Sequence, residues 1–184
     1  MYELSLNVMD IVQNSIRANA RLITVLVDVD EERDMLEIVI EDDGDGMSEE
    51  TRRAVTDPFF TTRTTRKVGL GLPYYEMVAT MCGGEFELWS EKGKGTRVSA
   101  SFGISHIDRA PLGNMGQTMA LLAGANSEID FVYTLSRGGE RFTFDTREVK
   151  GLLDGVPIDN PEIIMYMEGY VNENSLKLTG GITL

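Results

Sequence analysis

The fold is decided by residues 35–47, which read MLEIVIEDDGDGM. The first six residues form an apolar, β-branched run that is typical of a buried strand. Asp42 follows this run, and Gly44 and Gly46 permit a tight turn directly after it. A carboxylate at the end of a buried strand is expected at the floor of a pocket, where it can accept a hydrogen bond from an amino group.

The segments around this stretch alternate between helical and strand patterns. Apolar residues from Leu4 to Ala20 recur at intervals of three and four, as in an amphipathic helix. Asp10, Asn14 and Arg17 form a separate polar stripe of that helix. We predict two hairpins and three helices, with one face of the sheet covered by helices. The expected helices lie at about 4–20, 48–55 and 73–83, and the expected strands at 23–29, 35–40, 85–90 and 96–102.

The chain changes character after Ile104 without a long linker. The sequence Asn160-Pro161-Glu162 predicts an N-cap, a first-turn proline and an acidic first turn for a last long helix. We therefore divide the chain into residues 1–104 and a small α+β C-terminal region, 105–184. The expected elements of this region are helices at 115–122 and 146–153 and a hairpin of 131–135 with 141–144.

The charge balance narrows the classes of partner. Lys and Arg number 17 against 30 Asp and Glu, a net charge of −13 that repels nucleic-acid phosphates and anionic membranes. The C-terminal region is also acidic, which argues against DNA binding. A small basic cluster, Arg63, Arg66 and Lys67, lies in a threonine-rich loop and suits a single triphosphate. We expect no nucleic-acid and no membrane partner.

Cysteine and histidine are too scarce for disulfides or zinc clusters. Cys82 is the single cysteine and follows an apolar run, so we expect a packed core thiol rather than a nucleophile. His106 is the single histidine. We expect no signal peptide, because no basic segment followed by an apolar one precedes Leu4, and no apolar stretch has membrane-spanning length. We therefore expect a cytoplasmic protein.

Short motifs in a fixed order carry the most specific information. The motifs are DIVQNS (10–15), DDGDG (42–46), PFFTTR (58–63), GLGL (69–72) and GKGT (93–96). In this order they resemble the N-box, first glycine box, phenylalanine box, second glycine box and closing element of the GHKL (Bergerat-fold) ATPases, and most closely their histidine-kinase branch. The resemblance covers residues from about 4 to 104 and implies a two-layer α/β (α+β) sandwich of the histidine-kinase, gyrase and heat-shock-chaperone ATPase type.

The resemblance implies ATP and Mg²⁺ as ligands and assigns the site residues. Asn14 offers a neutral oxygen for Mg²⁺, although a solvated helix asparagine is the alternative. Asp42 would accept a hydrogen bond from the adenine amino group, supported by Thr96, which could also be a plain strand threonine. The lid over the triphosphate would run from Thr61 to Gly71, with Lys67 either a phosphate contact or a solvated charge. The other expected nucleotide contacts are Arg17, Gly44, Gly46, Met47, Thr62, Arg63, Gly69, Leu70, Gly71 and Leu72.

Asp10 lies one helical turn before Asn14, where related hydrolases and kinases carry a catalytic glutamate. Because aspartate is one methylene shorter, the resemblance implies slow turnover. We expect either a regulatory kinase or a slow ATPase that acts on or with a protein partner. A non-catalytic ATP-binding module is the alternative, and a homodimer is compatible with each. Histidine kinases place a dimerising helix pair before this domain, whereas here the N-box begins at Asp10, so we do not expect a conventional sensor kinase.

A second, weaker resemblance starts at His106. The stretch HIDRAPL (106–112) partly resembles the phospho-acceptor box of histidine kinases, which reads His-Glu-x-Arg-x-Pro-Leu. Ile107 replaces the acidic residue that normally follows the histidine, and the box follows the ATP-binding motifs instead of preceding them. A surface or domain-junction histidine is therefore the competing interpretation of His106.

Overall fold

The computed structural model describes residues 3–56, 71–181 and 184 of the chain. The predicted loop at 57–68 lies outside these residues. The helices are α1 (Leu4–Arg17), α2 (Glu49–Thr56), α3 (Gly71–Met81), α4 (Met115–Ala125), α5 (Thr146–Leu152) and α6 (Pro161–Thr179). The strands are β1 (Leu22–Asp30), β2 (Met35–Asp42), β3 (Phe86–Glu91), β4 (Gly95–Gly103), β5 (Asp130–Arg137) and β6 (Glu140–Asp145). The elements predicted from the sequence are all present, within a few residues of their expected ends.

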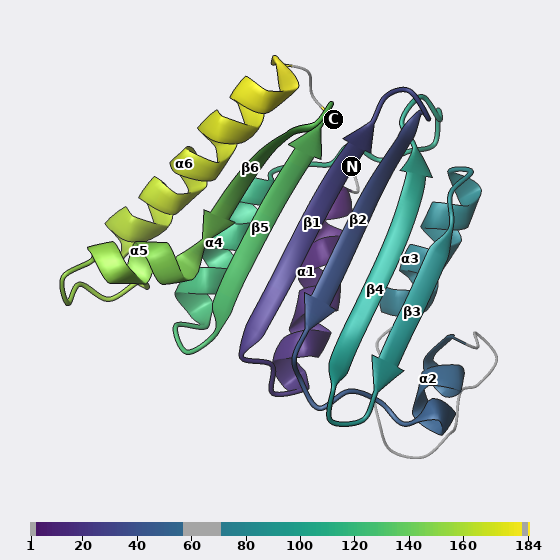
Figure 1. Ribbon diagram of the computed structural model, residues 1–184, viewed down its shortest axis with the longest axis horizontal. Coiled ribbons are helices and arrows are strands. Elements are labelled where there is room, and N and C mark those ends of the chain that lie inside the picture. The colour runs from purple at the N-terminus through teal and green to yellow at the C-terminus, as the bar shows by residue number, and fades with distance from the viewer. Residues whose placement is uncertain (1–2, 57–70, 182–183) are drawn as a thin grey trace.

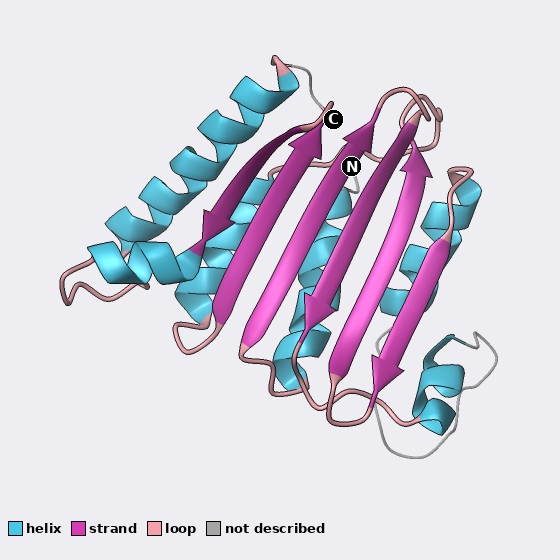
Figure 2. Ribbon diagram, viewed as in Figure 1, coloured by secondary structure: helices cyan, strands magenta, loops and turns pink. Residues whose placement is uncertain are grey.

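The strands form one six-stranded sheet in the order β3-β4-β2-β1-β5-β6. Figure 1 shows α1, α3 and α4 behind this sheet and α6 beside its β6 edge. The front face carries no helix among the described residues (Figure 2). The fold is therefore the predicted two-layer α/β arrangement, with helices on one face.

Strands from both sides of residue 105 belong to this sheet. β1 pairs with β2 in antiparallel orientation from Ile23↔Asp42 to Asp30↔Met35, as the hairpin pattern predicted. On its other side, β1 pairs in parallel with β5, from Leu22↔Asp130 to Val29↔Arg137. The C-terminal strands thus extend the sheet of the N-terminal half. The division at residues 104 and 105 stays a prediction about domains.

The core lies between the sheet and the helices behind it. Leu4, Val8 and Val12 of α1 are fully buried, as the spacing of three and four predicted. The strands alternate: along β1 the odd-numbered residues are buried and the even-numbered ones are partly exposed. Cys82 is 1% exposed, and burial raises the pKa of its thiol, so the predicted core thiol is confirmed.

Local capping explains where several helices begin. The Asn160 side chain accepts a hydrogen bond from Glu162 N at 2.9 Å and Pro161 occupies the first turn, as predicted. Ser48 accepts from Thr51 N at 3.2 Å at the start of α2. These contacts pair backbone donors that the first helical turn leaves unsatisfied.

Candidate functional site

A cavity of about 380 Å³ lies between α1 and the ends of β2 and β4. It combines apolar walls with a few polar groups, which is the usual composition of a small-molecule site. Of the expected nucleotide contacts, the structure brings Asn14, Arg17, Asp42, Gly46, Met47, Leu72 and Thr96 to this cavity. The other lining residues are Ile11, Ser15, Ala18, Ile40, Thr51, Val55 and Val98.

Asp42 forms the buried floor of this cavity, with only 7% of its surface exposed. Its Oδ2 accepts a hydrogen bond from Ser15 Oγ at 2.6 Å, and its Oδ1 accepts one from Gly44 N at 2.9 Å. These two hydrogen bonds fix the orientation of the carboxylate. Each of its oxygens can still accept a further hydrogen bond. A carboxylate in this setting can read an amino group on a ligand.

Thr96 lies beside Asp42 because the two residues are register partners on β4 and β2. Its hydroxyl lies 2.9 Å from Ser90 Oγ on β3. Ser90 Oγ also donates to Gly95 O at 3.0 Å and accepts from Met47 N at 2.8 Å. The hydroxyl of Thr96 and the backbone of Met47 are thereby held in place by one buried serine.

The two turns next to Asp42 require glycine. Gly46 and Gly95 have positive φ angles of 63° and 99°. A Cβ on Gly95 would lie 1.9 Å from Asp42 O, and one on Gly46 would lie 2.0 Å from Glu91 O. Larger residues would therefore push the two turns apart. Gly44 is close-packed as well, because a Cβ there would lie 2.6 Å from Ala18 O.

Asn14 and Arg17 border the cavity from α1. Arg17 Nη1 donates to Asn14 Oδ1 at 3.2 Å, so the oxygen expected to bind Mg²⁺ has a cation as its neighbour. A metal at this oxygen would displace that hydrogen bond and release Arg17. Arg17 is exposed and can then turn towards an anionic ligand.

Asp10 is exposed and is not one of the residues that line the cavity. It lies near Gly71, the first residue of α3, since a Cβ on Gly71 would be 3.7 Å from Asp10 Cβ. The start of α3 presents backbone N–H groups that favour anions. The remaining expected contacts, Thr62, Arg63, Lys67, Gly69 and Leu70, lie outside the described residues, as does the expected lid segment before Gly71.

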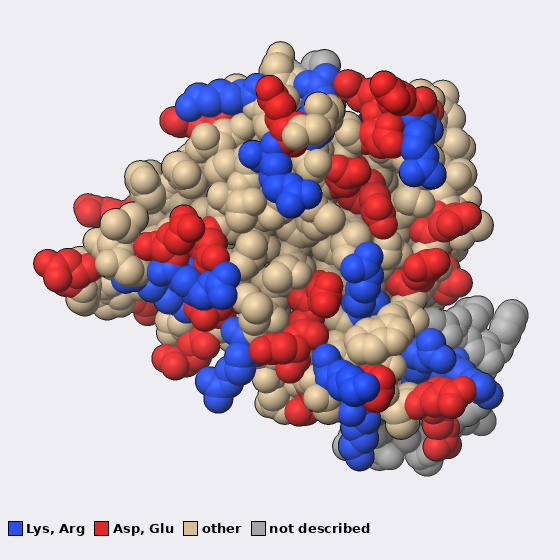
Figure 3. All heavy atoms as spheres, in the orientation of Figure 1, with Lys and Arg blue, Asp and Glu red and all other residues tan. Residues whose placement is uncertain are grey.

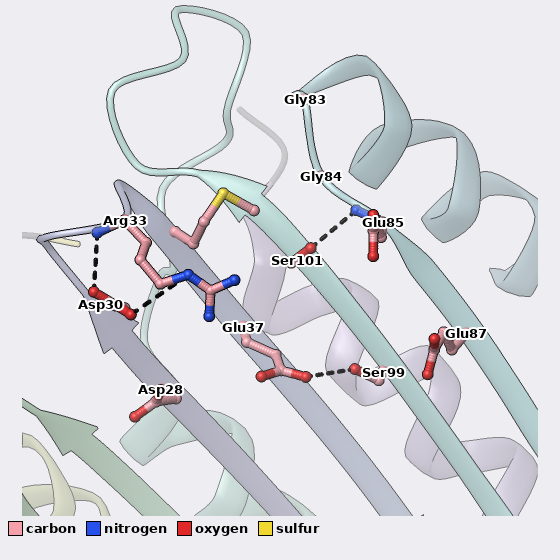
Figure 4. A pocket seen from close by; sticks show the side chains of 11 residues that line it. Asp28, Asp30, Arg33, Glu37, Gly83, Gly84, Glu85, Glu87, Ser99 and Ser101 are labelled. Carbon is pink, nitrogen blue, oxygen red and sulfur yellow. Dashed lines mark hydrogen bonds and ion pairs between the residues drawn. The ribbon is translucent and has the colours of Figure 1, made fainter.

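A second hollow, of about 440 Å³, lies on the uncovered face of the sheet (Figure 4). Glu37 there accepts a hydrogen bond from Ser99 Oγ at 2.7 Å, and Arg33 lies 4.0 Å from Asp30. Asp28, Glu85 and Glu87 add further carboxylates, as the close view shows. This concentration of negative charge disfavours a triphosphate. Figure 3 shows acidic side chains over much of the same face, and no continuous basic patch among the described residues visible there.

Two positioning residues were missed by sequence reasoning. Ser15 stands in the first motif and Ser90 at the end of the predicted strand 85–90, but the resemblance assigns neither a role in the site. A signal for Ser15 was present: it lies four residues after Ile11, on the buried side of α1, where a hydroxyl needs a partner. For Ser90 the sequence offers no such signal, because its partners come from two separate segments, the turn after β2 and the start of β4.

His106 lies beyond the opposite end of β4 from Thr96. Its backbone N donates to Gly103 O at 3.2 Å, just after the strand ends. Gly103 lies seven residues after Thr96 along the strand, a distance of about 23 Å. A ligand in the cavity and His106 of the same chain are therefore far apart.

None of the described helices has the length and apolar character needed to cross a membrane. In the same part of the chain, His, Cys, Asp and Glu side chains form no group of three or more suited to holding a metal ion.

Residues 3–105 match the sequence model of a family described as histidine kinase-, DNA gyrase B-, and HSP90-like ATPase. A putative sensor protein of Shewanella frigidimarina is 33% identical over 85 residues, which are 46% of this chain and 13% of that protein. The sensor protein DegM of a Bacillus species is 32% identical over 96 residues, 52% of this chain and 26% of the relative. The matches thus span about a quarter or less of these relatives. The crystal structure of the N-terminal domain of a DNA repair protein has a TM-score of 0.49 and 18% identity, covering 78% of this chain and 52% of that one.

Proposed function

This chain belongs to the family of histidine kinase-, DNA gyrase B- and HSP90-like ATPases, and from that premise we propose that it uses Mg-ATP to act on or with a protein partner. Its ATP-binding, histidine-kinase-like character follows from the family. Beyond the family, we propose that the chain binds Mg²⁺, has a protein partner and transfers or releases the terminal phosphate of ATP. The nucleotide would bind in the cavity at the ends of β2 and β4.

The residues at the floor of that cavity are the main support for this proposal. Asp42 is held by Ser15 and Gly44 with acceptor capacity to spare, and its register partner Thr96 lies beside it. The adenine amino group would donate to the Asp42 carboxylate. Apolar side chains, among them Ile40 and Val98, would pack against the faces of the base.

The polar end of α1 would hold the phosphates and the metal. Mg²⁺ prefers oxygen ligands and takes much of its coordination from phosphates and water, so the Asn14 oxygen suits it. Bound Mg-ATP supplies a phosphoryl group whose transfer depends on charge neutralisation and alignment. Arg17, released from Asn14, would contact the phosphates, and the start of α3 at Gly71 would offer backbone donors.

We place the catalytic carboxylate at Asp10. Its position near Gly71 puts it beside the expected phosphate end rather than at the adenine floor. From there it would orient the attacking hydroxyl or water and accept its proton, through a water where the short side chain does not reach. A regulatory kinase and a slow ATPase share this requirement. A non-catalytic nucleotide switch, the alternative, does not need Asp10.

The test measures ATP binding, phosphate release and protein labelling for the full chain with radiolabelled Mg-ATP. Asp42→Ala should abolish measurable binding because it removes the adenine acceptor. Asp10→Asn should keep binding and lose phosphate release or labelling. Glu41→Gln is the matched control, since Glu41 is the neighbouring carboxylate but is exposed and paired with Arg97 at 3.7 Å.

The outcomes separate the candidate functions. Release or labelling that depends on Asp10 supports the enzyme, and a labelled partner identifies a kinase. Binding without release or labelling supports the non-catalytic switch. If the unmodified chain bound no Mg-ATP, or bound it equally well after Asp42→Ala, the proposed site would be wrong.

A further inference from the structure

A groove of about 380 Å³ lies at the β6 edge of the sheet, between β6, α5 and α6. It belongs to the part of the chain beyond residues 3–105, the range that matches the family. Its walls are mainly apolar: Phe144 from β6, Leu152 from α5, and Ile163, Tyr166 and Tyr170 from α6. In Figure 1 this region is at the far side of the molecule from β3 and α2.

The apolar side chains at this groove are unusually exposed. Leu152 is 84% exposed, Tyr166 62% and Tyr170 41%. The two tyrosine rings stack with centroids 6.1 Å apart and an interplanar angle of 17°. Phe142 packs against Tyr170 at 5.7 Å, which anchors the pair to the sheet. Single exposed apolar residues are ordinary, but a gathered set around a hollow indicates a binding surface.

The rim of the groove is negatively charged. Glu148 is one of the lining residues and is exposed. Glu162 is also exposed and lies one helical turn before Tyr166 on α6. Within the described part of the chain neither carboxylate takes part in an ion pair. Both are therefore available to a cationic partner.

The nearby cations are paired mainly with other carboxylates, and Arg147 adds only a longer-range electrostatic interaction with Glu148. Arg147 is bound to Asp145, with Nη2 2.6 Å from Oδ2, and this contact lowers the pKa of the Asp145 carboxyl. Lys150 is bound to Asp130 with its Nζ 2.6 Å from Oδ1. Each cation is thus occupied by a carboxylate of its own chain. The groove consequently combines an apolar floor with an anionic edge.

We propose that this groove docks an amphipathic segment of a partner protein, which presents aliphatic side chains to the tyrosines and Lys or Arg to the glutamates. The negative charge of the rim favours a cationic partner over a second copy of this chain or an anionic membrane. A second copy of the chain would bring its own net charge of −13 to an acidic rim, and anionic membranes would be repelled for the same reason. Docking of an amphipathic helix in an apolar groove is a common recognition mode.

The test uses a fluorescent synthetic Leu/Lys peptide with an amphipathic helical pattern as the probe. Its anisotropy is followed during titration with the full chain, and a Leu/Glu peptide of the same pattern is the comparison. The Leu/Lys peptide should bind, whereas the Leu/Glu peptide should not. Leu152→Ser and Tyr166→Ser should each weaken binding about tenfold, as loss of an interface anchor does.

Charge and position are controlled separately. Glu148→Lys should weaken binding by about tenfold, while Glu32→Lys, the same charge change in the exposed β1–β2 turn, should leave it within about twofold. Leu176→Ser is the apolar control, since Leu176 is exposed on α6 but does not line the groove. All of these positions are exposed, so the variants should fold, and circular dichroism checks this.

Three results would overturn the proposal. The first is equal weakening by Glu32→Lys and Glu148→Lys, which would indicate attraction to the net charge alone. The second is equal binding of the Leu/Glu peptide. The third is a dimer of the unmodified chain that dissociates on Tyr166→Glu in sedimentation experiments, which would make a second copy the occupant. None of these depends on nucleotide, so the outcome is independent of the proposed ATPase or kinase activity.

Discussion

Replacing Asp42 with Asn should alter base selectivity while leaving the fold intact. In the unmodified protein Oδ2 accepts from Ser15 Oγ and Oδ1 accepts from Gly44 N. The new amide must keep its oxygen towards Gly44 N–H, because two donors cannot pair. Its NH₂ group then faces Ser15, whose hydroxyl can rotate and accept. The interior contacts are retained, and the free energy of unfolding should change by less than about 1 kcal/mol.

Asp42→Asn should affect nucleotide affinity more than stability, because the second N–H of the new amide points into the cavity, where the unmodified protein offers an acceptor. Adenine offers its 6-amino group there, and a buried mismatched pair costs about 1 to 3 kcal/mol. The dissociation constant for ATP should therefore rise by about 5- to 150-fold. Inosine triphosphate carries a carbonyl in the same place, which can accept from the amide. Its affinity should fall less or even improve.

Calorimetry with both nucleotides and with the Asp42→Asn and Glu41→Gln variants measures this difference. The preference for ATP over inosine triphosphate should shrink in the first variant and stay unchanged in the second. Chemical denaturation of the same samples checks the fold. Equal loss of affinity for the two nucleotides, or an unmodified protein without preference, would refute the assignment of Asp42 to base recognition.

Three further perturbations test the metal site, the turn and the electrostatics. Asn14→Ala should weaken Mg-ATP far more than metal-free ATP in calorimetry, and equal losses would remove the metal role. Gly95→Ala should lower the free energy of unfolding by more than about 2 kcal/mol, because the new Cβ would lie 1.9 Å from a main-chain oxygen. Gly93 also has a positive φ but open space around it, so Gly93→Ala should lower the free energy of unfolding by only about 1 kcal/mol. Similar values for the two variants would contradict the steric explanation. The hydrogen bond from Arg147 lowers the pKa of Asp145 in the folded state. The ionised carboxylate therefore stabilises the fold at pH values above its unfolded-state pKa, and this stabilisation is lost as the pH falls through its folded-state pKa. Denaturation of Asp145→Asn and the unmodified chain should thus show a stability difference at pH 7 that shrinks in acid, and a constant difference would count against it.

Local features were predictable from the sequence because they depend on neighbouring residues. The spacing of Leu4, Val8 and Val12 set the buried face of α1, and Asn160 with Pro161 set the start of α6. The motifs likewise predicted that Asp42, Thr96 and Asn14 lie together, and the three residues line one cavity. Each of these inferences needs only a periodicity, a cap or an ordered set of short motifs.

The tertiary structure alone decided which distant groups meet. A periodic pattern shows that one side of a strand is buried, but it does not say which strand lies beside it, so the parallel pairing of β1 with β5 was not predicted. For the same reason the contact of Ser15 with Asp42, 27 residues apart, emerged only when α1 was packed on β2. The groove between Phe144, Leu152 and Tyr166 also depends on how α5 and α6 pack at the sheet edge. Contacts between distant segments are set by packing of the whole chain, and no single stretch of sequence encodes them.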